Sequence, residues 1–359
     1  RESRALRTAS VTRVQSEALG EGRGFTGRVV RLRLDYDTPE DGAPRSLIVK
    51  LPAADPTIRT QLMEFGLYER EIRFYAEIAA SGGLPVPRMY GGHVDVDAGT
   101  SILLLEDLEQ ARLGDNVGGC SDEDAYLTVA RLARFHAAWW EHPRLMQLEW
   151  LAPGDPDASQ EVCQSQLAPF LEKFGDLLTP RLHTLAPRLA ATVAACERRW
   201  TAPPRTIVHR DFKLDNLIFG PPESAAPLTI IDWQLCSLGR GASDLAYFAA
   251  FCLRPEQRRS MERRMVEAYH ATLLAGGVRG YDLAVCWEDY RFATLTALQM
   301  VIVAGALLDM SSERGQALMA TLIGRIDAIL ADHNVGDLLP TGEVASRAST
   351  GDARPHHAT

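Results

Sequence analysis

The sequence contains very little lysine. Of its 38 basic residues only Lys50, Lys173 and Lys213 are lysine, and the other 35 are arginine. Lysine carries a compact charge on a flexible stem, whereas arginine carries a planar guanidinium, so the two do not substitute freely for each other beside a phosphate. Each lysine that this arginine-rich chain retains is therefore a candidate functional residue.

Paired cysteines and long apolar segments are also absent. The six cysteines are scattered, with no C-x-x-C pair and no Cys/His spacing typical of zinc. This pattern argues against a disulfide framework and predicts reduced thiols in a cytoplasmic protein. The longest apolar run, residues 300–308, is far shorter than the ~20 residues that cross a bilayer. We therefore expect no membrane partner, and the sequence shows no secretory signal.

Basic residues do not exceed acidic ones. The 359-residue chain has 38 Lys and Arg against 47 Asp and Glu, a net charge of −9, and 46% of its residues are hydrophobic. The acidic balance argues against a general nucleic-acid-binding protein, and the hydrophobic fraction argues against a disordered one. At ~150 residues per domain, the length predicts two domains or two lobes around a shared cleft.

The chain divides into a β-rich and a helical region. Strands are predicted over residues 27–36, 46–51 and 101–105, and one helix over residues 58–80. Further helices are predicted over residues 121–140, 160–178, 181–200, 255–275, 281–310 and 314–333. Residues 336–359, rich in Ser, Thr, Gly, Pro and Ala, are predicted to be a disordered tail. These patterns predict an α+β protein with a small β-rich lobe over residues 1–108 and a larger helical lobe over residues 109–335.

A polar loop interrupts the helical region. Residues 208–216 read VHRDFKLDN, and two short β-type segments follow at residues 217–219 and 228–231. An Asp five residues before an Asn, beside a hairpin that ends in another Asp, is an arrangement that phosphoryl transfer uses. Asp211 would accept the proton of an incoming hydroxyl, while Asn216 and Asp232 would supply oxygen ligands to Mg²⁺. The alternative is a capped turn in which Asp and Asn bind their own backbone.

A glycine-rich segment precedes the first predicted strand. Residues 22–29 fit the pattern G-x-G-x-x-G-x-V, in which the candidate phosphate-covering residues are Gly22, Gly24, Phe25, Thr26 and Gly27. Glycines there let backbone amides approach phosphate oxygens closely. A glycine-rich β-turn is the alternative, and Gly20 leaves the register of the pattern open.

Lys50 ends the apolar run of residues 47–49 and is the only lysine before residue 108. A compact charge projected from a strand suits the α- and β-phosphates of a nucleotide, and such a lysine needs a carboxylate to orient it. Glu71 is our choice among the acidic residues of the following helix, with Glu69 as its competitor. The alternatives are a solvated lysine at a strand end and a solvated helix face.

Residues 103–108 (LLLEDL) end the last strand of the first region. A strand that connects two lobes and leaves backbone groups unpaired on one side can bind the edge of an adenine. Glu106, Asp107 and Leu108 are therefore candidate nucleotide-binding residues, and an ordinary strand followed by a turn is the alternative.

In this order, these elements resemble the protein-kinase-like superfamily and, within it, the aminoglycoside phosphotransferase and choline kinase-like families of small-molecule kinases. The resemblance covers residues 22–248 and implies a two-lobed protein-kinase-like fold. Asp211 resembles the catalytic base, and Asn216 and Asp232 resemble the metal ligands. Lys50 and Glu71 resemble the ion pair that positions the phosphates, and residues 106–108 resemble the adenine hinge.

Several further residues have counterparts in these families. Lys213, two residues after Asp211, would sit near the transferred phosphoryl group and offset its charge. Antibiotic kinases usually have glycine at the position of Arg210. Asp244 resembles a structural aspartate that supports the catalytic loop, and His136 is expected to be a packing or hydrogen-bonding residue beneath that loop.

The resemblance implies an ATP- and Mg²⁺-dependent transfer of the γ-phosphoryl group to a hydroxyl of a small molecule. A Ser/Thr protein kinase and a non-catalytic nucleotide-binding pseudokinase are the alternatives. Against the former, Trp233 and Gln234 follow Asp232 in place of Phe-Gly, and no Ala-Pro-Glu closes an activation segment.

The acceptor is less constrained by the sequence. Residues after 108 carry a net charge of −7, which is compatible with a cationic acceptor such as an aminoglycoside or a choline-like amine. Residues 287–291 (WEDYR) are a candidate wall of the acceptor pocket, and a solvated charge cluster is the alternative.

Overall fold

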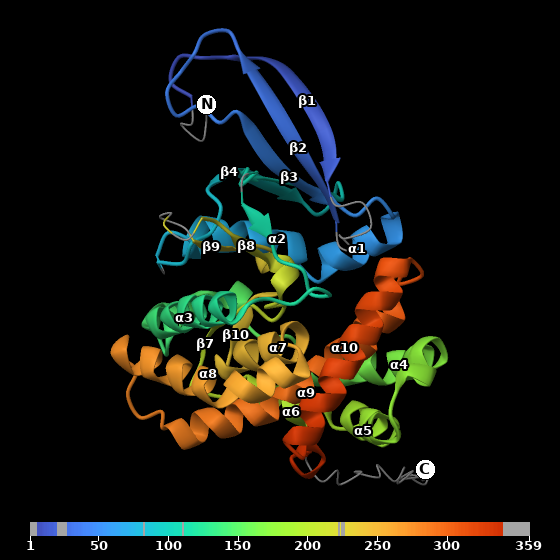
Figure 1. Cartoon of the computed structure of the whole chain (residues 1–359). Helices are drawn as coiled ribbons and strands as arrows, with labels where there is room; N and C mark the ends of the chain where they lie inside the picture. Colours follow the sequence, from blue (N-terminus) through green and yellow to red (C-terminus); the bar gives the residue numbers. More distant parts are fainter. Residues whose placement is uncertain are drawn as a thin grey trace, which may run out of the picture.

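A five-stranded antiparallel sheet forms the upper lobe of the molecule (Figure 1). The strand order is β1-β2-β3-β5-β4, with β1 (Val11–Leu19), β2 (Gly27–Tyr36), β3 (Ser46–Pro52), β4 (Met89–Asp95) and β5 (Thr100–Glu106). The computed structural model describes residues 6–19, 27–81, 83–109, 111–221, 223 and 227–339. Together with the helical lobe below the sheet, it confirms the predicted two-lobed α+β fold.

The three predicted strands are confirmed as β2, β3 and β5, whereas β1 and β4 had no individual prediction. Almost every residue of β1 is exposed, so this edge strand has no buried face to impose alternation. The β4 sequence contains Gly91 and Gly92, which read as a turn in the sequence alone. At Gly27 a Cβ atom would lie 2.5 Å from the carbonyl oxygen of Leu51, so β2 approaches β3 too closely for any other residue there.

The predicted helix over residues 58–80 is wrong as a single element. It consists of α1 (Pro56–Glu64), α2 (Leu67–Arg73) and a π-helical turn (Phe74–Ile78). The break falls at Gly66, whose φ of 67° is left-handed and interrupts the helix. Phe74 is fully buried and stacks on Trp233 of the lower lobe with ring centroids 3.9 Å apart. This stacking connects the helical segment below the sheet to the lower lobe next to Asp232.

The lower lobe is built from helices (Figure 1): α3 (Asp122–Trp139), α4 (Pro156–Phe174), α5 (Pro180–Ala190), α6 (Val193–Trp200), α7 (Ala242–Cys252), α8 (Pro255–Ala275), α9 (Leu283–Leu307) and α10 (Glu313–Asp332). The predicted helices are confirmed, except that residues 181–200 are two helices with a break at residues 191–192. No helix was predicted at α7. Every α7 residue except Ser243 is buried, so the segment has no polar face and no amphipathic period.

Helix α9 is long and apolar enough, by length and composition, to cross a membrane. However, 61% of its most apolar window is buried inside the lobe, where the helix packs against α4, α7 and α10. Burial on several sides explains the apolar composition, because a helix surrounded by protein has no need for a polar face.

Short strands frame the polar loop of residues 209–216. Strand β7 (Thr206–Val208) pairs with β10 (Ser237–Gly239), and β8 (Leu217–Phe219) lies between β6 (Arg112–Leu113) and β9 (Leu228–Ile230). The two predicted β-type segments are thus confirmed as the hairpin β8–β9. This hairpin brings the end of the loop and Asp232 to the same edge.

The predicted tail begins too early. Residues Val335–Asp337 form a 3₁₀ turn, and Leu339 is only 6% exposed. The burial of Val335 and Leu339 holds this segment on the helical lobe. Residues 340–359 lie outside the described residues.

Glu40 anchors the first described residues to the sheet, and we expect Glu40→Gln to release them. Its carboxylate accepts the backbone N–H groups of Ala9, Thr8 and Arg7 at 2.8, 2.8 and 2.7 Å. These bonds lower the pKa of Glu40 from 4.5 to about 2. Because the folded-state pKa is depressed, the anchoring is complete above pH 4.5 and is lost as the pH falls toward 2.

Amide hydrogen exchange measured by NMR tests this prediction. The three amides should lose protection in Glu40→Gln at neutral pH, and in the wild type at low pH. Asp41→Asn, at the exposed neighbouring position, is the matched control and should keep the protection. Unchanged protection in Glu40→Gln would contradict the anchoring role.

Candidate active site

Asp244 holds the backbone of the polar loop from below. Its carboxylate accepts the backbone N–H of His209 at 2.6 Å and that of Arg210 at 2.9 Å. His136 of α3 lies 3.4 Å from Asp244 and is hydrogen-bonded through Nδ1 to the hydroxyl of Tyr269 at 2.8 Å. Asp244 is 1% exposed. Both residues therefore lie under the loop, where they support its shape.

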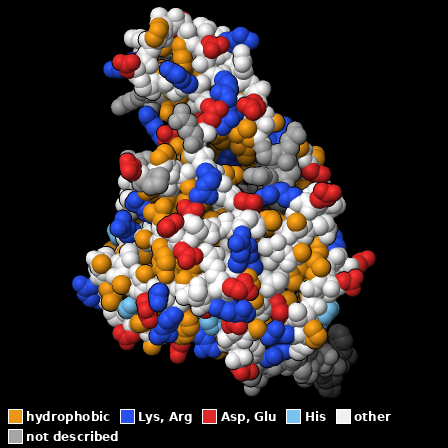
Figure 2. Space-filling view, in the orientation of Figure 1, with side chains coloured by type: hydrophobic (Ala, Val, Ile, Leu, Met, Phe, Trp, Pro, Cys, Tyr) orange, Lys and Arg blue, Asp and Glu red, His pale blue; other side chains and the backbone are white. Residues whose placement is uncertain are grey.

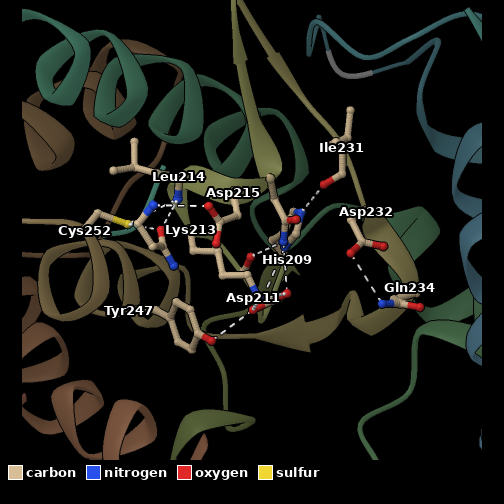
Figure 3. A network of polar contacts seen from close by, with 12 residues as sticks. His209, Asp211, Lys213, Leu214, Asp215, Ile231, Asp232, Gln234, Tyr247 and Cys252 are labelled. Carbon is tan, nitrogen blue, oxygen red and sulfur yellow. Dashed lines mark hydrogen bonds and ion pairs between the residues drawn. The ribbon is translucent and has the colours of Figure 1, made fainter. Parts of the chain in front are cut away.

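Asp211 is surrounded by hydrogen-bond donors (Figure 3). Lys213 Nζ lies 2.8 Å from both of its carboxylate oxygens, and Asn216 Nδ2 donates to Oδ2 at 2.9 Å. The hydroxyl of Tyr247 donates to Oδ1 at 2.9 Å. Three donors on the carboxylate of Asp211, whose side chain is 12% exposed, fix its orientation.

Tyr247 had no predicted role. It lies one turn after Asp244 on α7, so the same helix that supports the loop backbone also reaches the Asp211 side chain. Burial raises the pKa of Tyr247 well above its usual value, which keeps the hydroxyl protonated as a donor. The signal in the sequence was the segment DLAY, residues 244–247. It places the polar side chains of Asp244 and Tyr247 three residues apart in an otherwise apolar stretch.

Lys50 links the two lobes. Its Nζ lies 2.7 Å from the carboxylate of Glu71 on α2 and 2.7 Å from Oδ1 of Asp232. The side chains of Lys50 and Asp232 are 24% and 23% exposed, and that of Glu71 is 5% exposed. Of the two candidate partners, the structure thus brings Glu71 to Lys50. Glu69 is half exposed and lies 3.7 Å from Arg73.

Opposing effects set the pKa values of these charged groups. Burial acts to lower the pKa of Lys50, but the attraction of Asp232 and Glu71 outweighs it and raises that pKa. Burial likewise opposes the charge of Lys213, whose pKa is raised by Asp211. Burial acts to raise the pKa of Asp232, yet the pKa is lowered by Lys50. Both lysines are therefore cationic and Asp232 is anionic at neutral pH.

The three lysines of the chain differ in position. Lys50 and Lys213 lie on either side of the group formed by Asp211 and Asp232, whereas Lys173 donates to the backbone carbonyl of Ala306 inside the helical lobe. Two of the three lysines thus contribute compact cations to one site.

The oxygens near Asp211 fit a divalent cation such as Mg²⁺. Asn216 turns its amide nitrogen to Asp211, which leaves its carbonyl oxygen as a ligand, and Asp232 offers a carboxylate that is anionic at neutral pH. Such hard oxygen donors are the ligands that Mg²⁺ prefers. Among the described residues no group of three or more His, Cys, Asp or Glu forms a metal cluster, so the protein would provide few ligands and the nucleotide phosphates the others.

The candidate hinge residues are engaged within the upper lobe. The backbone N–H of Glu106 donates to the carbonyl of Arg88 at 2.8 Å. The carboxylate of Asp107 accepts from Nε of Arg31 at 2.7 Å. The Glu106 N–H and the Leu108 carbonyl, which accepts the N–H of Ala111 at 2.9 Å, are therefore not free for an adenine, and the hinge role of residues 106–108 stays a prediction.

The glycine-rich segment is only partly described. Gly22, Gly24, Phe25 and Thr26 lie outside the described residues, and Gly27 begins β2 beside β3, the strand that carries Lys50. Their predicted contact with phosphates stays a prediction.

A cavity of about 370 Å³ opens beside the loop. Its lining comes from the α1–α2 junction, the start of α4, the end of α6, the loop and its flanking strands, the start of α7 and the second half of α9: Phe65, Gly154, Asp155, Ala158, Ser159, Val162, Glu197, Trp200, Thr201, Val208, Arg210, Leu238, Gly239, Ser243, Asp244, Tyr247, Thr296, Gln299, Met300 and Val303. Tyr247 connects this cavity with Asp211.

Residues 287–291, predicted as a candidate wall of the acceptor pocket, lie away from this cavity, and that role stays a prediction. None of these residues lines the cavity, to which α9 contributes residues 296–303 instead. Asp289 pairs with Arg240 at 2.8 Å, and the hydroxyl of Tyr290 donates to Glu262 at 2.6 Å. The polar groups in the first half of α9 are therefore satisfied by partners outside this cavity.

A sequence model of the ecdysteroid kinase-like family matches residues 21–276, well over half of the chain. The chain belongs to this family. The ecdysteroid kinase-like match includes Lys50, the whole polar loop and Asp232, and thus confirms the resemblance to the protein-kinase-like superfamily.

Curated relatives of this ecdysteroid kinase-like chain are much longer proteins. It is 43% identical over 186 residues to acyl-CoA dehydrogenase family member 11 of Rattus norvegicus, and 26% identical over 184 residues to the Gallus gallus protein of that name. These matches cover 51% and 49% of this chain but 18% and 22% of the relatives. The chain therefore spans about a fifth of the length of those relatives.

Solved structures with a similar fold are small-molecule kinases. The GDP complex of aminoglycoside 2'-phosphotransferase-IIIa has a TM-score of 0.54 at 14% identity, with 90% of this chain and 93% of that chain covered. Plasmodium vivax ethanolamine kinase has a TM-score of 0.52 at 11% identity, with 88% and 83% covered. At such identities the similarity establishes the shared kinase-like fold.

Proposed function

We propose that this protein is a phosphotransferase that moves the γ-phosphoryl group of ATP to a hydroxyl of a small molecule. The observation that carries the proposal is the convergence of Asp211, Asn216, Asp232 and the two cations Lys50 and Lys213 on one site. A carboxylate base, oxygen ligands and compact cations are the groups that phosphoryl transfer requires.

Each residue has a distinct task in the proposed reaction. Asp211, held by Tyr247 and Asn216, orients the acceptor hydroxyl and takes its proton as the oxygen attacks phosphorus. Lys50, oriented by Glu71, binds the α- and β-phosphates. Lys213 offsets the negative charge that develops on the transferred group.

Asn216 and Asp232 would hold Mg²⁺. The ion supplies charge neutralisation on the nucleotide phosphates and helps to set their orientation. The protein's contribution is to fix these two ligands on adjacent segments, since Asn216 precedes β8 and Asp232 follows β9.

The structure of the segment between Asp232 and α7 argues against a protein as the acceptor. Residues 233–241 contain only a 3₁₀ turn and the short β10, which pairs with β7. An extended peptide would need an activation segment or an exposed docking edge, and this stretch is folded against the loop. A pseudokinase is disfavoured because the base and both candidate metal ligands are present.

An acceptor screen tests the proposal. Nucleoside diphosphate release with ATP or GTP is measured with Mg²⁺ and a panel of sugars, amino alcohols, aminoglycosides, macrolides and sterol-like alcohols, and the product is identified by its added phosphate in mass spectrometry. We expect at least one alcohol to be phosphorylated. Transfer to proteins alone, or no transfer to any alcohol class, would contradict the proposal.

A further inference from the structure

A buried carboxylate lies in the wall of the cavity beside the catalytic loop, and it is already neutralised. Glu197 has a side chain only 5% exposed. Arg210 lies 2.9 and 3.2 Å from its two oxygens, and Gln299 Nε2 donates to it at 3.1 Å. All three side chains line the cavity. The charge of Glu197 is therefore satisfied by the protein itself, before any acceptor enters.

Arg210 adopts an unusual backbone conformation to make this contact. Its φ of 65° is left-handed, a region that residues with a Cβ rarely occupy. Its N–H donates to Asp244 of α7 at 2.9 Å, so α7 holds the strained backbone, and the side chain of Arg210 reaches Glu197. A strained residue next to a reaction centre points to a functional constraint on its side chain.

Two other carboxylates line the cavity. Asp244 is 1% exposed and turns its oxygens to two loop amides, and Asp155 lies at the solvent-exposed start of α4, where it caps the helix by accepting the N–H of Asp157 at 2.9 Å. Most of the remaining described lining is apolar or uncharged, including Trp200, Met300 and Val303. A cation in the interior of this cavity would lose hydration, and the buried carboxylate there, Glu197, is already paired with Arg210.

Surface charge does not change this balance. On the face shown in Figure 2, acidic and basic side chains are interspersed over the helical lobe. The net charge of −7 after residue 108 is a sum over the whole region, and it does not describe the charge of the cavity.

We propose that Arg210 is a specificity-determining residue: by masking Glu197 it makes the acceptor pocket select alcohols that carry no cationic group. This inference rests on the proposed function for its assignment of the cavity to the acceptor. It distinguishes this protein from kinases whose acceptor alcohols carry an amine, because here an arginine already pairs with the buried carboxylate of the cavity.

Three probes of nearly the same shape and different charge test the proposal: choline, 3,3-dimethyl-1-butanol and 3,3-dimethylbutanoate. Binding is measured by NMR without nucleotide, with the methyl signal of Met300 reporting occupancy of the cavity. We expect the wild type to bind the neutral alcohol more tightly than choline. Equal or tighter binding of choline, or no Met300 response to any probe, would overturn the proposal.

Arg210→Gly is the decisive variant, because glycine accepts the left-handed backbone while Glu197 loses its counter-charge. The ratio of choline to alcohol affinity should rise by about tenfold or more, the scale of one unmasked charge in a partly buried site. The matched control is the double variant Arg210→Gly with Glu197→Gln, in which the ratio should return toward the wild-type value. A ratio unchanged in Arg210→Gly would overturn the proposal.

Glu197→Gln tests the same pair from the other side and leaves the loop sequence intact. Arg210 then faces the cavity without its carboxylate, so the anionic 3,3-dimethylbutanoate should gain affinity relative to the alcohol. No gain would count against Arg210 as a charge that faces the ligand.

These outcomes separate the two proposals. Binding ratios that shift as expected while no alcohol is phosphorylated would support the masking of Glu197 by Arg210 in this cavity and contradict both the phosphotransferase and the assignment of the cavity to its acceptor. Phosphorylation of an alcohol, together with a choline-to-alcohol affinity ratio that Arg210→Gly leaves unchanged, would support the phosphotransferase and contradict the role of Arg210 in specificity.

Discussion

Asp211→Asn is expected to lower turnover with any alcohol acceptor by about 10³-fold, the scale of losing a positioned general base. An amide cannot take the hydroxyl proton, and its NH₂ group would meet the donors Lys213, Asn216 or Tyr247, which now bind the carboxylate. Nucleotide binding should survive, because Lys50 and Asp232 are unchanged. Steady-state kinetics and nucleotide titration measure the two effects separately.

Asp215→Asn is the matched control for this variant. Asp215 lies in the same loop, where its Oδ1 accepts the backbone N–H of Asn116 at 3.1 Å, a bond that an amide oxygen also accepts. Turnover within a few-fold of the wild type is expected. If Asp211→Asn were as active as Asp215→Asn, Asp211 would not be the base.

Lys50→Arg is expected to lower kcat by about 10² to 10³-fold, comparable with the loss of one preorganised donor to a charged transition state. The charge is kept, but a planar guanidinium cannot place a single point charge 2.7 Å from both Glu71 and Asp232. The position of the lysine, rather than its sign, would then be what the reaction needs. Measured kcat and nucleotide KM, together with the thermal midpoint of unfolding, test this.

Lys173→Arg provides the same substitution away from the site. Its ammonium binds the carbonyl of Ala306, a contact that an arginine can also make. We expect activity near that of the wild type. Equal effects of the two substitutions would show that the loss comes from lysine replacement in general and not from the site.

Much of this organisation was readable from the sequence. Strands β2, β8 and β9, helix α8 and the polar loop were predicted because alternation, helical period and turn residues lie within a few positions of one another. The scarcity of lysine singled out Lys50 and Lys213 before any contact was known.

Other features depended on packing. Glu71 and not Glu69 pairs with Lys50 because of the face that α2 presents to β3. The helix that carries both residues starts after the break at Gly66. Helix α7 was not predicted because it is buried on nearly all sides. The contact of its Tyr247 with Asp211 was missed for the same reason. A single sequence does not reveal these, since each depends on how an element is covered by its neighbours.

The sequence by itself determined the candidate reaction centre, because the polar loop and the hairpin after it are local and carry at fixed spacing the groups that phosphoryl transfer requires. Only the tertiary structure decided what faces that centre. Glu197 of α6 lies 13 residues before Arg210 of the loop, whereas Gln299 of α9 lies 102 residues after Glu197, and the three meet in one cavity. Their mutual neutralisation is a property of distances in space, which spacing along the chain does not encode.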